Sequence, residues 1–343
     1  MYSRNYQQNV ITHPQQTEPV DAVITWVDGH DPCHQQKLAD YFAEHGINVR
    51  PKAAEPTRFN QCGEIYYCVL SLLQYAPWIR TIYIVTDNQI PAIINQLAGT
   101  AYEHKVKVVD HKQIFSGYES CLPTFNSLAI ESVLWRIEGL AERFIYLNDD
   151  CILIRPVSYQ DFFNGEKLVL RGSWKTQARY KWHNRLKQAI YSLLRKPLDI
   201  LKNNEYRGFQ ELSAEHAGFK RRFFHLPHMP FPLHKQPFVQ FHQDFPVLFE
   251  QNLRFRLRNR KQFWLISLIY HLEIKNNKAV IDNTIEEITF HTAFHSFKKI
   301  RQRLSRAEIG KKHAFICIQS LDQATQPVLD YLSGWLNQRI KPL

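Results

Sequence analysis

The sequence has no CxxC pair, no glycine-rich phosphate loop and no long apolar run. Its six cysteines are scattered over 343 residues, which fits neither a disulfide framework nor a zinc ribbon and is met most simply in a reducing cytosol. The absence of GxGxxG and Walker motifs excludes a plain Rossmann cofactor site. No uncharged apolar stretch reaches the roughly 20 residues that span a bilayer, and the opening MYSRNYQQ lacks the apolar run of a secretion signal. These absences predict a cytoplasmic globular protein.

The chain is rich in apolar and basic residues instead. Hydrophobic residues make up 44% and aromatic residues 13%, which allows a substantial core and excludes disorder for most of the chain. Lysine and arginine number 43 against 32 acidic residues, a formal charge of +11. Residues 165–262 alone hold 20 basic and 7 acidic residues, so the remainder is close to neutral. This division predicts a neutral scaffold beside a surface for a polyanion, which could be nucleic acid, anionic lipid, nucleotide or a phosphate-bearing polymer.

Short β-rich runs alternate with helical patterns in the first half of the chain. Strands are expected at residues 21–27, 81–86, 106–109 and 143–147, and helices at residues 63–75 and 127–140. The alternation predicts an α/β fold with a mostly parallel sheet and helices on both faces. We divide the chain into a tail (1–19), an α/β core (20–164), a basic region (165–262) and a largely helical C-terminal region packed on the core (263–343).

Acidic residues follow each expected strand, at Asp28, Asp87, Asp110 and Asn148-Asp149-Asp150. The carboxyl ends of parallel strands share one edge, where ligands bind, although single Asp and Asn residues also favour turns. The neighbouring Asp149 and Asp150 would repel each other unless a cation or a hydrogen-bond donor offset their charge. The pair therefore predicts a hydrated Mg²⁺ or Mn²⁺ held against a diphosphate.

Two polar residues precede the second expected helix. Asn126 and Ser127 could cap it, and could also direct donors and the helix N-terminus at a phosphate.

The basic region offers two further candidates for phosphate chemistry. His228 lies among His225, His234 and His242, and an unperturbed pKa of about 6.5 suits a general base near neutral pH. The alternation in residues 254–258 (RFRLR) predicts a strand with three guanidinium groups on one face, which could hold phosphate oxygens or form a solvated edge.

Two other segments have ordinary structural interpretations. Residues 181–202 form a basic amphipathic stretch in which Leu186, Ile190, Leu193 and Leu194 recur at helical spacing. We expect this face to pack on the sheet domain, and the alternative is a helix that contacts a lipid surface at the inner face of the cell membrane. His291 and His295, four residues apart on one expected helix face, lack the Glu of an HExxH zinc motif and are interpreted as structural.

Four segments occur in an order that is typical of one family. They are residues 21–32 (DAVITWVDGHDP), a long block from residue 58 through 122–131 (LPTFNSLAIE) to 144–150 (FIYLNDD), residues 227–230 (PHMP) with Phe255-Arg256, and a weaker match at 315–318. In these segments the chain resembles the Stealth sugar-phosphate transferases, which include bacterial capsule phosphotransferases and the catalytic core of the enzyme that tags lysosomal glycoproteins.

The resemblance implies a GT-A-like nucleotide-binding fold completed by the basic region. It also implies transfer of a hexose 1-phosphate from a UDP-sugar to a hydroxyl of an oligosaccharide or polymer acceptor, which could be lipid-anchored, with release of UMP. By position, Asp149 and Asp150 match the family's acidic pair, His228 its catalytic His and Arg256 its phosphate-binding Arg. We expect Mg²⁺ or Mn²⁺ on the acidic pair, and substrate contacts from the residues at the sheet edge: Asp28, Asp87, Asn126, Ser127 and Asn148.

Departures from the family pattern leave alternatives open. Asn88 stands where a Gly is usual, Tyr66 replaces an expected Arg, and Gln319-Ser320 replaces a common Asn-Asp pair, which calls an active-site role for the C-terminal segment into question. A Leloir glycosyltransferase would share the donor, the metal and the acids but release UDP. A nucleic-acid-binding protein is disfavoured, because no such motif is visible and acids at the sheet edge would repel phosphate backbones.

Overall fold

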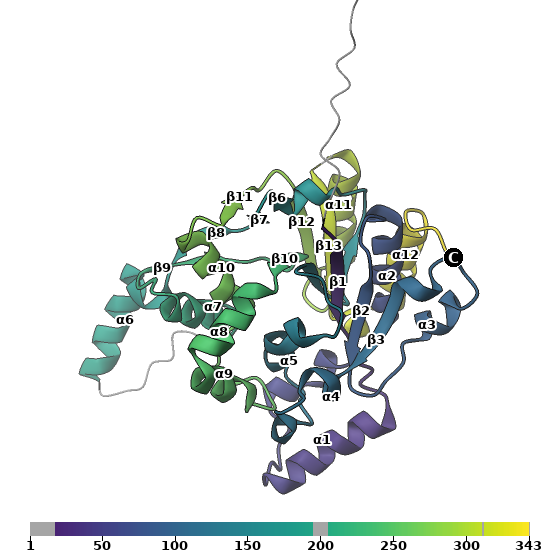
Figure 1. Cartoon of the computed structure of the whole chain (residues 1–343). Helices are drawn as coiled ribbons and strands as arrows, with labels where there is room; N and C mark the ends of the chain where they lie inside the picture. The colour runs from purple at the N-terminus through teal and green to yellow at the C-terminus, as the bar shows by residue number, and fades with distance from the viewer. Residues whose placement is uncertain (1–17, 195–204, 311, 343) are drawn as a thin grey trace, which may run out of the picture.

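The computed structural model describes residues 18–194, 205–310 and 312–342 (Figure 1). Its centre is a five-stranded sheet in the order β10-β4-β1-β2-β3, in which β1 to β4 run parallel and β10 runs antiparallel to β4. The strands are β1 (Val20–Thr25), β2 (Ile82–Thr86), β3 (Val106–Asp110), β4 (Arg143–Asn148) and β10 (Phe231–His234). The predicted α/β class, the mostly parallel sheet and the four strands of the first half are confirmed.

The central strands are continuous apolar runs because both faces of the sheet are covered. All of β2 is buried, as are the first five residues of β1 and of β4. Asp21 in β1 is fully buried and accepts two hydrogen bonds from Arg80, at 2.9 and 2.6 Å, and one from the Ala141 amide at 2.8 Å. A buried carboxylate is tolerated here because its oxygens are paired.

Helices and short turns connect the strands on both sides of the sheet. The helix expected at 63–75 is confirmed as α2, which follows Gly63 in the left-handed region (φ 89°). The helix expected at 127–140 is shorter than predicted, because α5 ends at Val133 and a 3-10 turn, η5 (Leu134–Arg136), follows it. The helices of the first half are α1 (Pro32–Glu44), α2 (Glu64–Tyr75), α3 (Ala92–Leu97), α4 (His111–Ile114) and α5 (Ser127–Val133).

The C-terminal region contributes strands as well as helices. Its helices are α10 (Leu265–Lys275), α11 (Phe297–Ile309) and α12 (Gln326–Asn337). The sequence analysis missed β12 (Glu286–His291) and β13 (His313–Gln319), which form a three-stranded sheet with β5 (Cys151–Leu153) directly after the acidic pair. The expectation that His291 and His295 share a helix face is wrong, because His291 ends β12 and His295 lies in the turn before α11.

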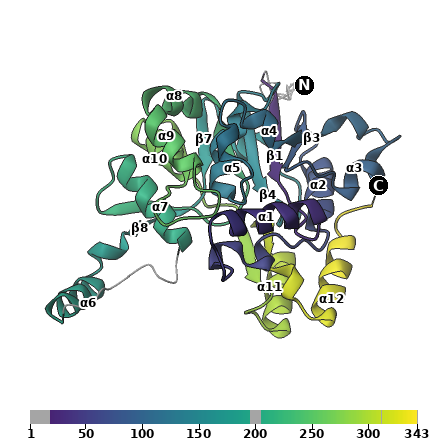
Figure 2. The same cartoon turned by 90° about the horizontal axis from the view of Figure 1, so that it is seen from below.

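The basic region packs beside the sheet as a group of helices and short strands (Figures 1 and 2). The alternating segment at 254–258 does not form a strand: α9 ends at Leu253, and the chain crosses to α10 in an irregular loop. The expected packing of the basic amphipathic stretch on the sheet domain is also wrong, because no residue of its helix, α6, is buried. Besides β10, the elements of this region are β7 (Lys167–Leu170), β8 (Ser173–Thr176), α6 (Trp182–Leu193), α7 (Glu205–His216), β9 (Arg222–His225), α8 (Gln236–Asp244) and α9 (Pro246–Leu253). Two strands from outside it, β6 (Phe163–Asn164) and β11 (Ala279–Ile281), pair with β7. Residues 195–202 of the amphipathic stretch lie outside the described residues.

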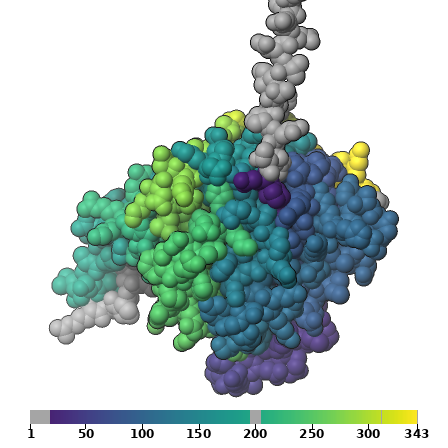
Figure 3. Space-filling model, viewed as in Figure 1, coloured from purple at the N-terminus to yellow at the C-terminus, as the bar shows by residue number. Residues whose placement is uncertain are grey.

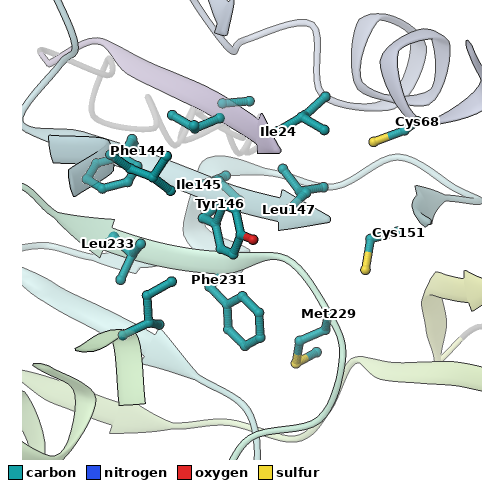
Figure 4. Packing of buried hydrophobic residues seen from close by; sticks show 14 of the residues in the cluster. Ile24, Cys68, Phe144, Ile145, Tyr146, Leu147, Cys151, Met229, Phe231 and Leu233 are labelled. Atoms are coloured by element: carbon teal, nitrogen blue, oxygen red, sulfur yellow. The ribbon is translucent and has the colours of Figure 1, made fainter. Parts of the chain in front are cut away.

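Strand β4 joins the sheet to the basic region. Tyr146 on β4 stacks on Phe231 of β10, with ring centroids 6.1 Å apart and planes at 18° (Figure 4). Phe231 also meets Trp264 edge to face at 5.3 Å, and Trp264 precedes α10. These aromatic contacts bury large side chains between the two parts of the chain, and they fix the basic region against the carboxyl half of β4. No helix among the described residues combines the length and apolarity needed to cross a bilayer.

Candidate active site

The strand order places the ligand crevice at the ends of β1 and β4. The chain proceeds from β1 through β2 to β3 on one side and then adds β4 on the other side of β1. Ligands bind in open α/β sheets where the order reverses in this way, beyond the carboxyl ends of the strands. Asp28 follows β1, and Asn148, Asp149 and Asp150 end or follow β4, so these residues flank the reversal.

The acids after β2 and β3 lie farther out and have structural partners. Asp87 accepts a hydrogen bond from Lys37 Nζ at 2.8 Å, which is also an ion pair. Asp110 caps α4 through the Lys112 amide and accepts from the Asn88 amide at 2.6 Å. Asp28 has a local contact, since its Oδ1 accepts a hydrogen bond from the His30 amide at 2.9 Å. The substrate contacts of Asp28 and Asp87 stay predictions.

The acidic pair at the end of β4 carries charge that the described residues do not neutralise. Both carboxylates are only partly exposed, and burial raises the pKa of Asp149 well above its usual value, with the charges of Asp150 and Glu64 adding to the effect. Burial likewise raises the pKa of Asp150 to about 6. Asp150 Oδ1 is buried without a hydrogen-bond partner. An orphaned carboxylate oxygen beside a second carboxylate fits a hard divalent cation.

Two further acids that the sequence analysis did not single out belong to this group. Glu64, buried in the first turn of α2, raises the pKa of both Asp149 and Asp150 through its charge. Asp322, in the turn after β13, accepts from Thr57 Oγ1 at 2.8 Å and from Asn60 Nδ2 at 3.0 Å, and its charge in turn raises the pKa of Glu64. The C-terminal segment therefore lies at this edge, despite the missing Asn-Asp pair. No spacing in the sequence links it to α2.

Two cysteine thiols, those of Cys151 and Cys317, lie next to Asp150. Ligand atoms of Asp150, Cys151 and Cys317 all lie within 4.8 Å of one another, because Cys317 on β13 faces Cys151 on β5. Hydrogen bonding with Cys151 and burial raise the pKa of the Cys317 thiol well above its usual value, and Cys317 Sγ donates to Asp150 Oδ2 at 3.4 Å. A protonated thiol is a poor metal ligand. The donor set therefore fits Mg²⁺ or Mn²⁺ on the carboxylates better than a soft ion.

A pocket beside the end of β4 brings distant candidate residues together. It has about 390 Å³ of empty space, part of it open to solvent, between β4, α5, α7 and the loops before β10 and α10. Ser127, Asn148 and His228 from the sequence analysis all line it. The full lining is Ser127, Leu128, Glu131, Tyr146, Asn148, Tyr206, Phe209, His228, Phe231, Arg258 and Trp264.

His228 enters the pocket in an uncharged form. Its ring stacks on Tyr206 of α7, with centroids 4.4 Å apart and planes at 21°. Burial, with the nearby positive charge of Arg258, lowers the pKa of His228 to about 4, well below the 6.5 assumed from the sequence. The imidazole is therefore neutral at pH 7, the form from which a general base acts, but it is a weaker base than a free histidine.

The arginines of the alternating segment point to different partners. Arg254 pairs with Glu250 on α9. Arg256 donates to the Ser120 carbonyl at 3.0 Å and lies over the ring of Tyr41, so it is not part of the pocket wall in this structure.

Arg258, which the resemblance did not single out, is the arginine that lines the pocket. It donates to Ser127 Oγ at 2.7 Å. Burial and, to a smaller extent, the charge of Arg258 lower the pKa of Arg58. Arg58 forms an ion pair with Glu205 at 3.8 Å. Arg258 is thus the guanidinium group in the pocket wall, and Arg58 lies outside it. The alternation in the sequence gave no reason to prefer Arg258 over its neighbours.

Glu131 is a buried acid in the pocket wall that the sequence analysis quoted only within a motif. Burial raises the pKa of its carboxyl to about 7, and Trp264 Nε1 donates to its Oε2. Beside it, the Tyr146 hydroxyl bonds Asn148 Oδ1 at 2.8 Å and Thr25 Oγ1 at 3.0 Å. These contacts hold Asn148 at the mouth of the crevice between β1 and β4.

Asn126 serves the fold rather than the pocket wall. It is fully buried and its Oδ1 accepts the Leu128 amide, which confirms the predicted N-cap of α5. Its Nδ2 donates to the Phe255 carbonyl at 2.6 Å and to Gln262 Oε1 at 2.9 Å. Asn126 therefore ties α5 to the loop that carries Arg258, and a contact with substrate stays a prediction.

Curated relatives of this chain are named for polysaccharide phosphotransfer. An exopolysaccharide phosphotransferase of Streptomyces coelicolor is 36% identical over 260 residues, which are 74% of this chain and 25% of that protein. A capsular polysaccharide phosphotransferase of Actinobacillus suis is 40% identical over 150 residues, 44% of this chain and 39% of that protein. The chain thus spans about a quarter to two fifths of these relatives.

Solved structures match this chain weakly. Galactosyltransferase LgtC in complex with donor and acceptor sugar analogs is 8% identical, covers 94% of this chain and 97% of its own, and has a TM-score of 0.42. Mouse xyloside xylosyltransferase 1 is 12% identical, covers 87% and 97%, and has a TM-score of 0.38. The strand order and the connecting helices of this chain show the α/β fold by themselves.

Family models match two parts of the chain in order. The model of Stealth protein CR1, conserved region 1, matches residues 18–46. The model of Stealth protein CR2, conserved region 2, matches residues 58–170. The first match holds β1 and α1, and the second runs from α2 through the acidic pair to β7. With both conserved regions present in order, at the sheet edge where the acids and the pocket meet, the chain belongs to the Stealth family.

Proposed function

We propose that this chain transfers a hexose 1-phosphate from a UDP-sugar to a hydroxyl of a capsular or exopolysaccharide acceptor, forming a phosphodiester and releasing UMP. The observation that carries the proposal is that His228, Arg258 and Asn148 meet in one pocket at the end of β4, next to Asp149 and Asp150. A proton acceptor, a positive group and a carboxylate pair are what transfer of a phosphate between two oxygens requires. The relatives named exopolysaccharide phosphotransferase and capsular polysaccharide phosphotransferase support the same reaction class.

In this proposal the acceptor hydroxyl attacks the phosphorus that bears the sugar. The bond from that phosphorus to the bridging oxygen breaks, and UMP leaves with the electron pair. His228 accepts the hydroxyl proton on its neutral ring, and the anionic phosphate of a bound donor would stabilise the imidazolium that forms. Arg258 offsets charge on the transferred phosphate from the wall where it contacts Ser127. A Mg²⁺ or Mn²⁺ ion bound by Asp149 and Asp150 would neutralise charge on the donor diphosphate.

Other residues are proposed to position the substrates. Asn148 and Ser127 line the pocket and offer polar groups to the donor. Asp28 follows β1 at the strand-order reversal, where a nucleotide or sugar hydroxyl could be bound. Arg256 is proposed as a second phosphate contact on the resemblance alone, since its guanidinium rests on the Ser120 carbonyl. The basic region 165–262 is proposed to supply the acceptor side of the site.

The decisive measurement is the nucleotide that is released. Purified protein is incubated with a panel of UDP-sugars, Mg²⁺ and capsule oligosaccharides, and the nucleotide product is separated by chromatography. The proposal expects UMP, together with a phosphodiester resonance in phosphorus NMR of the acceptor. Release of UDP and a glycosidic product without phosphorus would instead identify a Leloir glycosyltransferase. Salt-sensitive binding to nucleic acid with no turnover of any UDP-sugar would support the nucleic-acid alternative.

A further inference from the structure

Helix α6 is an apolar surface that the described part of the chain leaves uncovered. Trp182 is 77% exposed and Leu193 is 85% exposed, and Leu186, Ile190 and Leu194 are also exposed. The helix projects from the body of the molecule at the outer end of the basic region (Figures 1 and 2), and the space-filling view shows the same projection (Figure 3). Isolated exposed apolar residues are common, but several on one helix mark an interaction surface.

These side chains form one face because of their spacing. At about 100° per residue, Trp182, Leu186, Ile190 and Leu193 fall within an arc of about 80°. Arg185 and Lys187 lie about 60° beyond the two edges of this arc. The uncharged polar residues Gln188 and Ser192 lie about 160° and 120° from its middle. An apolar stripe bordered on both sides by cations is the arrangement of helices that lie in the interface of a membrane.

The base of the helix is fixed to the body. The preceding turn, η7 (Ala178–Tyr180), is held by a hydrogen bond from the Ala178 amide to Glu211 of α7 at 2.8 Å. Gln177, fully buried, donates to the Phe219 carbonyl at 2.9 Å. Asn184 Nδ2 then donates to the Ala178 carbonyl at 2.8 Å. The N-terminal end of α6 is therefore held on the body of the protein next to α7. Helix α7 also supplies Tyr206 and Phe209 to the pocket.

Charge decides between the occupants of this surface. No Asp or Glu occurs from residue 167 to residue 198, whereas nine Lys or Arg do. A second copy of the same helix would bring these cations against each other, while an anionic surface would pair with them. We propose that α6 binds the surface of a lipid bilayer that contains anionic lipid. Its apolar face, Trp182, Leu186, Ile190 and Leu193, inserts at the boundary between the headgroups and the acyl chains.

The test uses the full chain and vesicles of 30% phosphatidylglycerol in phosphatidylcholine, with pure phosphatidylcholine vesicles as the reference. Flotation is expected to recover the protein with the anionic vesicles at low salt and much less of it with the neutral ones. Trp182→Ser/Leu186→Ser/Ile190→Ser is expected to weaken binding by at least about tenfold. Arg185→Gln and Lys187→Gln are expected to weaken it by about fivefold each, and added salt should do the same.

Two matched controls test whether the loss belongs to this face. Val49→Ser/Ile309→Ser removes equally exposed apolar side chains elsewhere, since these residues are 82% and 87% exposed. Gln188→Ala/Ser192→Ala changes residues of α6 that lie outside the apolar arc. Both controls are expected to bind vesicles as the parent chain does. Equal loss in either control, or unchanged binding of the triple serine variant, overturns the proposal.

Trp182 itself reports whether the surface is free. The fluorescence difference between the parent chain and Trp182→Phe isolates its signal, which should be quenched by acrylamide without vesicles and protected with them. Protection in the absence of vesicles, or a dimer in light scattering that the triple variant makes monomeric, would assign the face to the chain itself or to a second copy and overturn the proposal. Vesicle binding needs no UDP-sugar, so its failure and the failure of the proposed reaction are separate results.

Discussion

The acidic edge and the pocket lie on either side of the same strand end, and burial acts on them in opposite directions. At the edge, burial raises the pKa of Asp149 and Asp150, so the carboxylates tend toward the neutral acid. In the pocket, burial lowers the pKa of His228 to about 4, so the imidazole tends toward the neutral base. Desolvation disfavours whichever form is charged. The edge therefore gains from a cation, and the pocket already holds a group that can take a proton.

The largest effect is expected at the acidic edge. Asp150→Asn should reduce turnover with Mg²⁺ by about three orders of magnitude or more, because the neutral amide no longer holds the ion against the donor diphosphate. Steady-state kinetics over a Mg²⁺ titration measures this. Asp110→Asn is the matched control, because Asp110 ends β3, a parallel strand separated from β4 by β1 and β2 in the same sheet, but caps α4. Activity of the Asp150 variant that survives a chelator would remove the metal role.

A smaller loss is expected in the pocket. His228→Ala should lower kcat by about 10²–10⁴-fold, the usual contribution of a general base, while donor binding stays near normal. Calorimetric titration with the UDP-sugar and measurement of kcat separate the two quantities. His225→Ala is the control, since burial also lowers the pKa of His225 to about 4, but it does not line the pocket. A His228 variant with near-normal kcat would show that another group takes the proton.

The two arginines that the structure separates should differ in effect. Arg258→Lys is expected to cost about 2–3 kcal/mol of transition-state stabilisation if its guanidinium bonds phosphate, because Lys cannot form two parallel hydrogen bonds. Arg256→Lys should change kcat/KM little, since Arg256 contacts the Ser120 carbonyl outside the pocket. Kinetics of the two variants side by side decide the assignment. A larger loss for Arg256 would favour the family match over the geometry seen here.

The smallest effect is a shift in pH dependence that tells the edge from the pocket. A bound ion needs ionised carboxylates, so activity at low Mg²⁺ should fall as pH drops through about 6, where Asp150 takes up a proton. More Mg²⁺ should move this fall to lower pH by competing with the proton. A second fall in activity, where His228 takes up a proton near pH 4, should not shift with the Mg²⁺ concentration. Profiles of kcat/KM at two Mg²⁺ concentrations test this, and a single limb near 6.5 at both would restore the unperturbed histidine.

Sequence patterns predicted the first half of the chain better than the second. The strands of the sheet are recognisable because buried parallel strands are continuous apolar runs, and the turn residues after them mark their ends. Residues 254–258 misled, because alternation alone does not make a strand when no neighbouring strand pairs with it. The prediction that the amphipathic stretch packs on the sheet domain was also wrong. A helical apolar stripe shows that a helix has an apolar face, but it does not show what covers that face.

The amino-acid sequence already showed that acidic residues follow the strands of the site. Asp28 after β1 and Asn148-Asp149-Asp150 at the end of β4 can be recognised from local sequence alone. Only the tertiary structure decided that Arg258 rather than Arg256 lines the pocket, that Glu64 and Asp322 join the acidic pair, and that His228 is uncharged. The physical reason is range. Periodicity and turn chemistry act over a few residues. Burial and Coulombic coupling depend on residues that are far apart in the sequence, from 30 positions for Arg258 and His228 to 258 for Asp322 and Glu64.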